Sequence, residues 1–89
     1  MENIKEIEVL GKMIGEKARL KILFLLKDQE INSSKIQKRI HLPQNLTSHH
    51  LQTLLKNKFV TIRKSGRFSY YSLNKQEIKK RIAELKTLI

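Results

Sequence analysis

Apolar residues recur at helical spacing along most of this chain, and two short intervals instead have the composition of strands. The first helical pattern covers about Asn3 to Ile14 and places Ile4, Ile7 and Ile14 on one face. The second covers about Lys17 to Lys27 and is apolar nearly all round, which is typical of a central core helix. These patterns predict that the N-terminal third of the chain is helical.

A short third helix and a longer fourth helix are expected on either side of Pro43. Residues 32–34 offer three N-cap side chains for the third helix, in which Ile36 and Ile40 face inward. This helix ends before Pro43, because the residue that precedes a proline is pushed away from helical geometry. Proline also suits the opening of the next helix, which we expect from Gln44 to Lys56.

The fourth helix has two chemically different faces, which helical periodicity separates. Its inward stripe consists of Thr47, Leu51, Leu54 and Leu55. Its opposite face carries polar, hydrogen-bonding side chains, namely Gln44, Asn45, Ser48, His49 and Gln52. We therefore expect one face to pack on the core and the other to meet a polar partner.

A hairpin and a last helix complete the predicted fold. The segments Phe59–Lys64 and Arg67–Leu73 are rich in β-branched and aromatic residues and flank Ser65-Gly66, which predicts a tight turn. Asn74 and Glu77 form a capping box. The helix that follows carries one apolar stripe, made of Ile78, Ile82, Leu85 and Ile89. The fold class is mainly α with a small β-hairpin: a winged helix-turn-helix in a single domain, residues 1–89.

The charge of the chain is strongly positive and unevenly distributed. The formal net charge is +11 and the isoelectric point is near 10.2, which indicates an acidic partner such as nucleic acid, an anionic membrane or an acidic protein. No acidic residue occurs from Ile31 to Gln76, whereas nine lysines and arginines do. An acid-free surface with a polar-faced helix and a basic hairpin tip favours double-stranded DNA.

The predicted elements assign different contacts to different side chains. The fourth helix would enter a major groove, where Gln and Asn can address adenine and Ser, Thr and His can bond to base edges. The third helix and the hairpin tip would place cations, Arg39 among them, near phosphates. The predicted DNA-binding residues are Lys35, Lys38, Gln44, Asn45, Thr47, Ser48, His49, Gln52, Arg63, Lys64 and Arg67.

Several function classes are disfavoured by what the sequence lacks. The chain has no cysteine, so disulfides and thiolate metal sites are excluded. No apolar run approaches the roughly 20 residues that span a bilayer, and no signal-peptide pattern opens the sequence. No carboxylate pair or base-activated serine is apparent, so we do not expect an enzyme. A cytoplasmic protein without a cofactor is expected.

The interval from Val9 to Asn74 resembles the ArsR-type (arsenical-resistance repressor) winged-helix regulators. The matching motifs are Lys17–Leu23 (Lys-Ala-Arg-Leu-Lys-Ile-Leu), Thr47–Leu51 (Thr-Ser-His-His-Leu), Leu54, Gly66-Arg67 and Tyr70–Leu73 (Tyr-Tyr-Ser-Leu). The resemblance implies a homodimer through the first and last helices, and a repressor released from its operator by a signal, usually a metal ion. It also implies base reading by Gln44, Asn45, Ser48 and His49, and a wing contact by Arg67.

The sequence departs from the family pattern where metals would bind. The stretch that carries cysteines in metal-sensing members is here Glu30–Ser34 (Glu-Ile-Asn-Ser-Ser), and the last helix has no histidine. Neighbouring His49 and His50 are about 100° apart on a helix and cannot share one ion. We therefore expect no metal site. His41 replaces a turn glycine and should adopt positive φ, and Asn57 is expected to take the left-handed helix cap.

The apolar stripes of the terminal helices have two interpretations. They could be monomer core, or they could join two copies through Ile4, Ile7, Ile14, Ile78, Ile82, Leu85 and Ile89. We favour a homodimer, which would bind a pseudo-palindromic operator with its two reading helices roughly 34 Å apart. Three functional alternatives remain open: a winged-helix module for protein or RNA contact, nonspecific DNA coating, and a metal-responsive repressor with a non-cysteine site.

Overall fold

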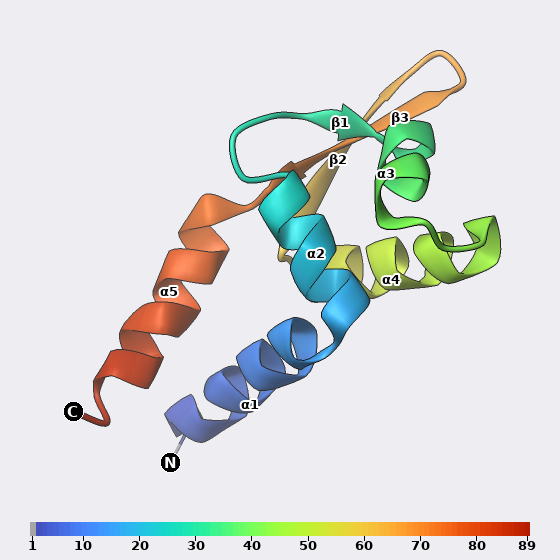
Figure 1. Cartoon of the computed structure of the whole chain (residues 1–89). Helices are drawn as coiled ribbons and strands as arrows, with labels where there is room; N and C mark the ends of the chain where they lie inside the picture. The colour runs from blue at the N-terminus through green and yellow to red at the C-terminus, as the bar shows by residue number, and fades with distance from the viewer. Residues whose placement is uncertain (1) are drawn as a thin grey trace.

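The computed structural model describes residues 2–89, with side chains from residue 4 onward. In this part of the chain, helices and short strands follow the predicted order with one addition, a strand before the third helix (Figure 1). The elements are α1 (Glu2–Gly15), α2 (Lys17–Leu25), β1 (Ile31–Asn32), α3 (Ser33–Ile40), α4 (Gln44–Lys56), β2 (Val60–Ser65), β3 (Phe68–Leu73) and α5 (Lys75–Lys86). This is the winged helix-turn-helix arrangement expected from the sequence.

Strand β1 is the element that the sequence did not predict. It pairs with β3 in an antiparallel sheet of order β1-β3-β2, with Ile31 opposite Tyr71 and Asn32 opposite Tyr70. A strand of two residues is too short to show the alternation that identifies strands, and it exists only because β3 offers a free edge. The hairpin strands also begin one residue later than expected, at Val60 and Phe68.

The hydrophobic core lies where α1, α2, α3, α4 and the sheet meet. Its buried members are Leu10, Met13, Ile22, Leu23, Leu26, Ile31, Ile36, Leu51, Leu54, Phe59, Val60 and Tyr71. Helix α2 contributes Ile22 and Leu23 to this core, as expected of a central helix, but its apolar residues are not all buried. Its outer face stays open, because Phe24 is 68% exposed and Leu20 is 37% exposed. Helix α2 therefore contributes both to the core and to an apolar surface.

The end of α4 shows why Lys58, and not Asn57, adopts the left-handed conformation. Asn57 has a φ of −93°, whereas Lys58 has a φ of 66°. The Lys58 N–H donates to the carbonyl oxygen of Leu55 at 3.1 Å, and the Phe59 N–H donates to that of Leu54 at 2.9 Å. These two bonds define a Schellman ending, which turns the chain so that Phe59 packs inside beside Leu54. The prediction for Asn57 was therefore wrong by one residue.

Two other local predictions fared differently. His41 adopts a φ of 56° in the turn between α3 and α4, as expected. The capping box at α5 is only half formed: Asn74 Oδ1 accepts from the Glu77 N–H at 3.3 Å, but the Glu77 carboxylate pairs with Arg81 at 3.0 Å. The N-cap of α3 is Asn32, whose Oδ1 accepts from the Lys35 N–H at 2.9 Å.

Helix α5 lies beside α1 at the end of the molecule that carries both termini, and the hairpin projects at the opposite end (Figure 1). None of the α5 side chains is fully buried. Arg81 fastens the helix instead: it donates to the carbonyl oxygen of Glu6 at 3.3 Å, and its guanidinium lies 5.2 Å from the centre of the Phe59 ring. Helix α5 is therefore held by contacts of Arg81 rather than by fully buried side chains of its own.

Candidate nucleic-acid interface

Helix α4 presents the polar face that its periodicity predicts. Leu51 and Leu54 are buried against the core. The side chains that were expected to read bases are all exposed, namely Gln44, Asn45, Ser48, His49 and Gln52. We call these five residues the polar face of α4. Because the opposite side of the helix is packed, this face is held in a fixed orientation toward solvent.

Thr47 does not belong to this face, and its predicted DNA contact is corrected. Only 3% of the residue is exposed. Its hydroxyl donates to the carbonyl oxygen of Pro43 at 3.1 Å, within the first turn of α4. Thr47 therefore secures the start of the helix from inside, as its place in the inward stripe already indicated.

The N-terminus of α4 is open to an anion. Its N-cap is Pro43, which forms no side-chain cap, and its first turn contains no acidic residue. The first N–H groups of a helix have no partner within the helix, and the helix dipole is positive at that end. A backbone phosphate placed there would accept these N–H groups and neutralise the dipole.

A small cleft between α3 and α4 adds residues that the sequence analysis missed. The cleft has a volume of about 60 Å³, and its polar lining comes from Ser33, Ser34, Gln37, Gln44, Thr47 and Ser48. Ser33 and Gln37 are one helical turn apart, so helical spacing was the signal that could have revealed them. Lys35 and Lys38 are exposed on the same helix, as expected. Arg39 instead lines a hollow beside α2, on another side of α3.

The hairpin tip brings two predicted cations together and separates the third from them. Lys64 and Arg67 are exposed on either side of the turn, where Gly66 has a φ of 59°. Arg63 is committed elsewhere. Its Nη2 and Nε donate to the two carboxylate oxygens of Glu30, at 2.8 and 3.1 Å. Sequence reasoning missed this pair because Glu30 lies just outside the acid-free interval.

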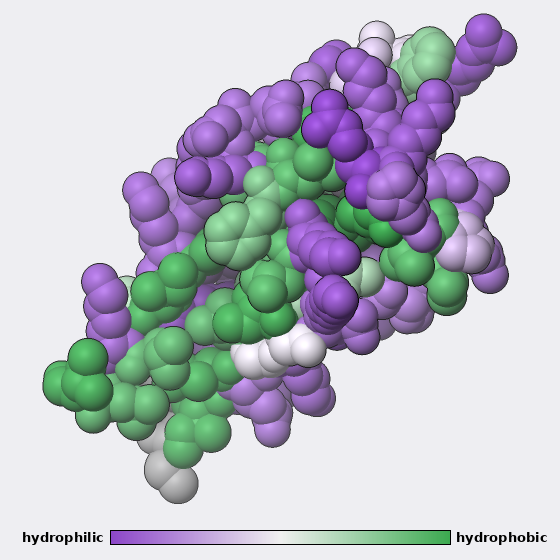
Figure 2. All heavy atoms as spheres, in the orientation of Figure 1, coloured by the Kyte–Doolittle hydropathy of each residue, from purple (hydrophilic) through white to green (hydrophobic). Residues whose placement is uncertain are grey.

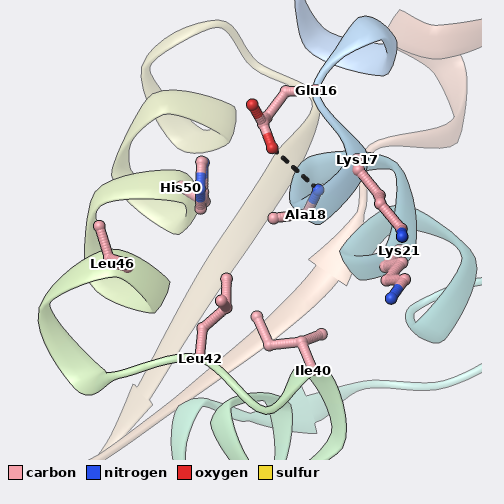
Figure 3. A pocket seen from close by; sticks show the side chains of 8 residues that line it. All are labelled: Glu16, Lys17, Ala18, Lys21, Ile40, Leu42, Leu46 and His50. Atoms are coloured by element: carbon pink, nitrogen blue, oxygen red, sulfur yellow. Dashed lines mark hydrogen bonds between the residues drawn. The ribbon is translucent and has the colours of Figure 1, made fainter.

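A second hollow lies behind the polar face, between α2 and α4 (Figure 3). Its volume is about 420 Å³, and His50 lies half-buried on its α4 side. His50 Nδ1 lies 3.3 Å from Nη1 of Arg19, and Nη2 of the same arginine donates to the carbonyl oxygen of Lys12 at 2.8 Å. Burial, together with the Arg19 charge, lowers the pKa of His50. A neutral His50 therefore connects α4 to the end of α1 through Arg19.

The described residues offer neither a metal centre nor a membrane span. No three histidine, aspartate or glutamate side chains from residues 4–89 come together as a set of ligands. No helix between residues 2 and 89 combines the length and the apolar character needed to cross a bilayer.

The far end of the molecule carries an apolar groove between α1, α2 and α5. Its volume is about 370 Å³, and it is lined by Leu10, Ile14, Leu20, Leu23, Phe24, Lys27, Leu73, Ile78, Ile82 and Leu85. Figure 2 shows hydrophobic residues gathered over these helices and hydrophilic residues over the hairpin end. Four of the predicted interface residues line the groove, namely Ile14, Ile78, Ile82 and Leu85. The sequence did not assign the α2 residues Leu20 and Phe24 to it.

The remaining predicted interface residues lie outside the lining of the groove. Ile4 on α1 is 55% exposed and Ile89 at the C-terminus is fully exposed, whereas Ile7 is half-buried. Together with the groove they extend the apolar surface toward the chain termini.

Comparison with known proteins identifies the family. The family model described as "Bacterial regulatory protein, arsR family" matches residues 16–61. The arsenical resistance operon repressor of Staphylococcus aureus is 34% identical over 70 residues, which cover 79% of this chain and 67% of that protein. The transcriptional activator HlyU of Vibrio cholerae serotype O1 is 32% identical over 93 residues, which cover 97% of this chain and 86% of that protein.

The fold comparison agrees with the sequence comparison. The solved structure of HlyU from Vibrio cholerae N16961 has a TM-score of 0.82 and 32% identity, and the match covers 97% of this chain and 94% of that one. The family match spans α2 to the start of β2, which includes the whole helix-turn-helix. The chain is therefore a DNA-binding transcriptional regulator, and it belongs to the bacterial arsR family of regulatory proteins.

Proposed function

We propose that this regulator is a homodimeric repressor that binds a pseudo-palindromic operator in the cytoplasm. The observation that carries the proposal is the exposed polar face of α4, held by a packed opposite side and flanked by the basic hairpin tip. An α-helix fits the major groove, where amide and imidazole groups can distinguish base pairs. The tip cations Lys64 and Arg67 would then meet the flanking backbone or minor groove.

The apolar groove supports the dimer. A continuous apolar surface on a small, highly charged chain is costly to leave in water. A second copy of α1 and α5, related by two-fold symmetry, would cover the groove with the same kind of surface. The same symmetry would direct two copies of α4 into successive major grooves on one side of the duplex.

Repression is proposed as the simplest output of such a dimer. A protein that occupies an operator can block transcription initiation without any catalytic step, so we propose no enzymatic activity. The similar proteins include both a repressor and an activator, so the position of the operator relative to the promoter would decide the output.

Selection of bound fragments from a random duplex library tests the proposal. The selected sequences should share a two-fold symmetric site, which the protein prefers over random duplex by roughly 10³-fold or more. Enriched sequences without symmetry would overturn the dimeric operator model.

Substitutions in the polar face test base reading. Gln44→Ala and His49→Ala should each cost about 1–3 kcal/mol at the selected site and relax the preference at one position of each half-site. Affinity for random duplex should change far less. Equal losses on both duplexes would assign these two residues to phosphate contact instead.

A further inference from the structure

One ion pair crosses the outer face of the sheet. Glu30 directly precedes β1 at one edge, and Arg63 lies on β2 at the other edge, with β3 between them. Arg63 stands opposite Tyr70 in the β2–β3 register, and its guanidinium lies 4.6 Å from the centre of the Tyr70 ring. The arginine thus extends over the middle strand, along the tyrosine ring, to reach the glutamate.

The pairing removes Arg63 from the cations that the hairpin can offer. Two charge-assisted hydrogen bonds join its guanidinium to both oxygens of the Glu30 carboxylate. These bonds lower the pKa of Glu30, so the carboxylate is fully charged near neutral pH. The pair is therefore neutral overall, and two cations at the tip, Lys64 and Arg67, remain free of ion pairs in the described part of the chain.

This exposed pair contributes little to stability. The side chains are 57% and 36% exposed, and ion pairs at such positions are weakened by water and salt. The pair matters instead for how the hairpin binds DNA. If Arg63 turned to a phosphate, it would leave Glu30 as an uncompensated negative charge beside a polyanion.

We propose that Glu30 limits the affinity for duplex DNA by holding Arg63 away from the phosphates. The proposal rests on DNA binding through the hairpin, as described above. For a chain with a net charge of +11, each withheld contact makes release from DNA easier. Glu30 sets the strength of the hairpin contact, and Arg63 is a residue held in reserve rather than a phosphate ligand.

Salt titrations on a random-sequence duplex test the proposal. Glu30→Gln should steepen the plot of log K against log salt by about 0.9, which corresponds to about eight-fold tighter binding at 0.1 M salt. In the Glu30→Gln/Arg63→Gln double variant the gain should disappear, because the freed arginine is its source.

Asp28→Asn is the matched control. It removes one negative charge, as Glu30→Gln does, but two residues earlier. Asp28 is exposed and forms no ion pair with arginine in the described structure. A gain from Asp28→Asn as large as that from Glu30→Gln would overturn the proposal, since net charge would explain both. So would an unchanged or flatter slope for Glu30→Gln, or a double variant that keeps the whole gain. Random duplex makes this test independent of whether a symmetric operator exists.

Discussion

The two ends of this molecule expose opposite kinds of surface. At the end of α1 and α5, isoleucines and leucines border an apolar groove. At the end of α4 and the hairpin, the exposed residues are mostly amides, hydroxyls, imidazole and cations, with Leu46 and Phe68 as exposed apolar residues among them. All eight acidic residues and the remaining ten cations lie outside residues 31–76, although Glu30 pairs with Arg63 at the sheet. The difference supports the two partners proposed above: a second copy of the chain at the apolar end and DNA at the other end.

The comparison also shows how the two ends are connected. Arg19 at the start of α2 donates to the carbonyl oxygens of Lys12 and Met13 in α1 and approaches His50 in α4. Helix α2, which lies between the ends, therefore connects the apolar end to the back of α4. A substitution at one end should therefore leave the other end unaffected, unless it alters the contacts of Arg19 with α1 and α4.

The largest effect is expected at the apolar end. Ile82 lines the groove and is 40% exposed, so Ile82→Glu should leave the monomer folded but place a carboxylate inside the proposed interface. Burial of an unpaired charge costs several kcal/mol, so the dimer dissociation constant should rise by about 100-fold or more. Sedimentation equilibrium measures this change.

Ala83→Glu is the control for this experiment. It makes the same change of charge on the next residue of α5, away from the apolar stripe, and Ala83 is exposed. If both variants dimerised as tightly as the unaltered protein, the groove would not be the interface.

An intermediate effect is expected at the hairpin end. Arg67→Ala should weaken binding to every duplex by about eight-fold at 0.1 M salt and reduce the salt slope by about one unit. Fluorescence anisotropy at several salt concentrations measures both quantities. Lys79→Ala removes the same charge from α5, at the opposite end, and should leave the slope unchanged. An unaltered slope for Arg67→Ala would show that the hairpin tip does not touch DNA.

The smallest effect is expected at the connection between the ends. The pKa of His50 is lowered in the folded protein, so at acidic pH the unfolded chain binds more protons than the folded one. The free energy of unfolding should therefore fall as the pH drops from 7 to 5. In His50→Gln this fall should be smaller, and urea unfolding at each pH measures it. Equal falls in both proteins would show that Arg19 and burial do not affect the protonation of His50.

The periodicity of the sequence was sufficient to predict the helices and the polar face of α4. Helical spacing is a local property, and the residues that define it lie within a few turns of one another. The same spacing placed Thr47 in the inward stripe, although the residue type favoured a DNA contact. The structure decided in favour of spacing, because a threonine can bury its hydroxyl by bonding to its own helix, here at Pro43.

The two left-handed turn residues that follow α3 and α4 were predicted with different success. His41 follows the last turn of α3 and adopts positive φ as expected. At the end of α4 the side chain preferred Asn57, but the need to insert Phe59 into the core moved the left-handed residue to Lys58. Core packing outweighed the local preference, since burying a phenylalanine contributes about 1.5–3 kcal/mol.

The sequence by itself determined the order of elements, the two faces of α4 and the segregation of charge, since each depends on residues close together along the chain. Only the tertiary structure decided which residues meet across long intervals. Strand β1, the Glu30–Arg63 pair 33 residues apart and the contribution of α2 to the apolar groove all required the folded chain. Such contacts depend on how whole elements pack, and no local pattern encodes that geometry.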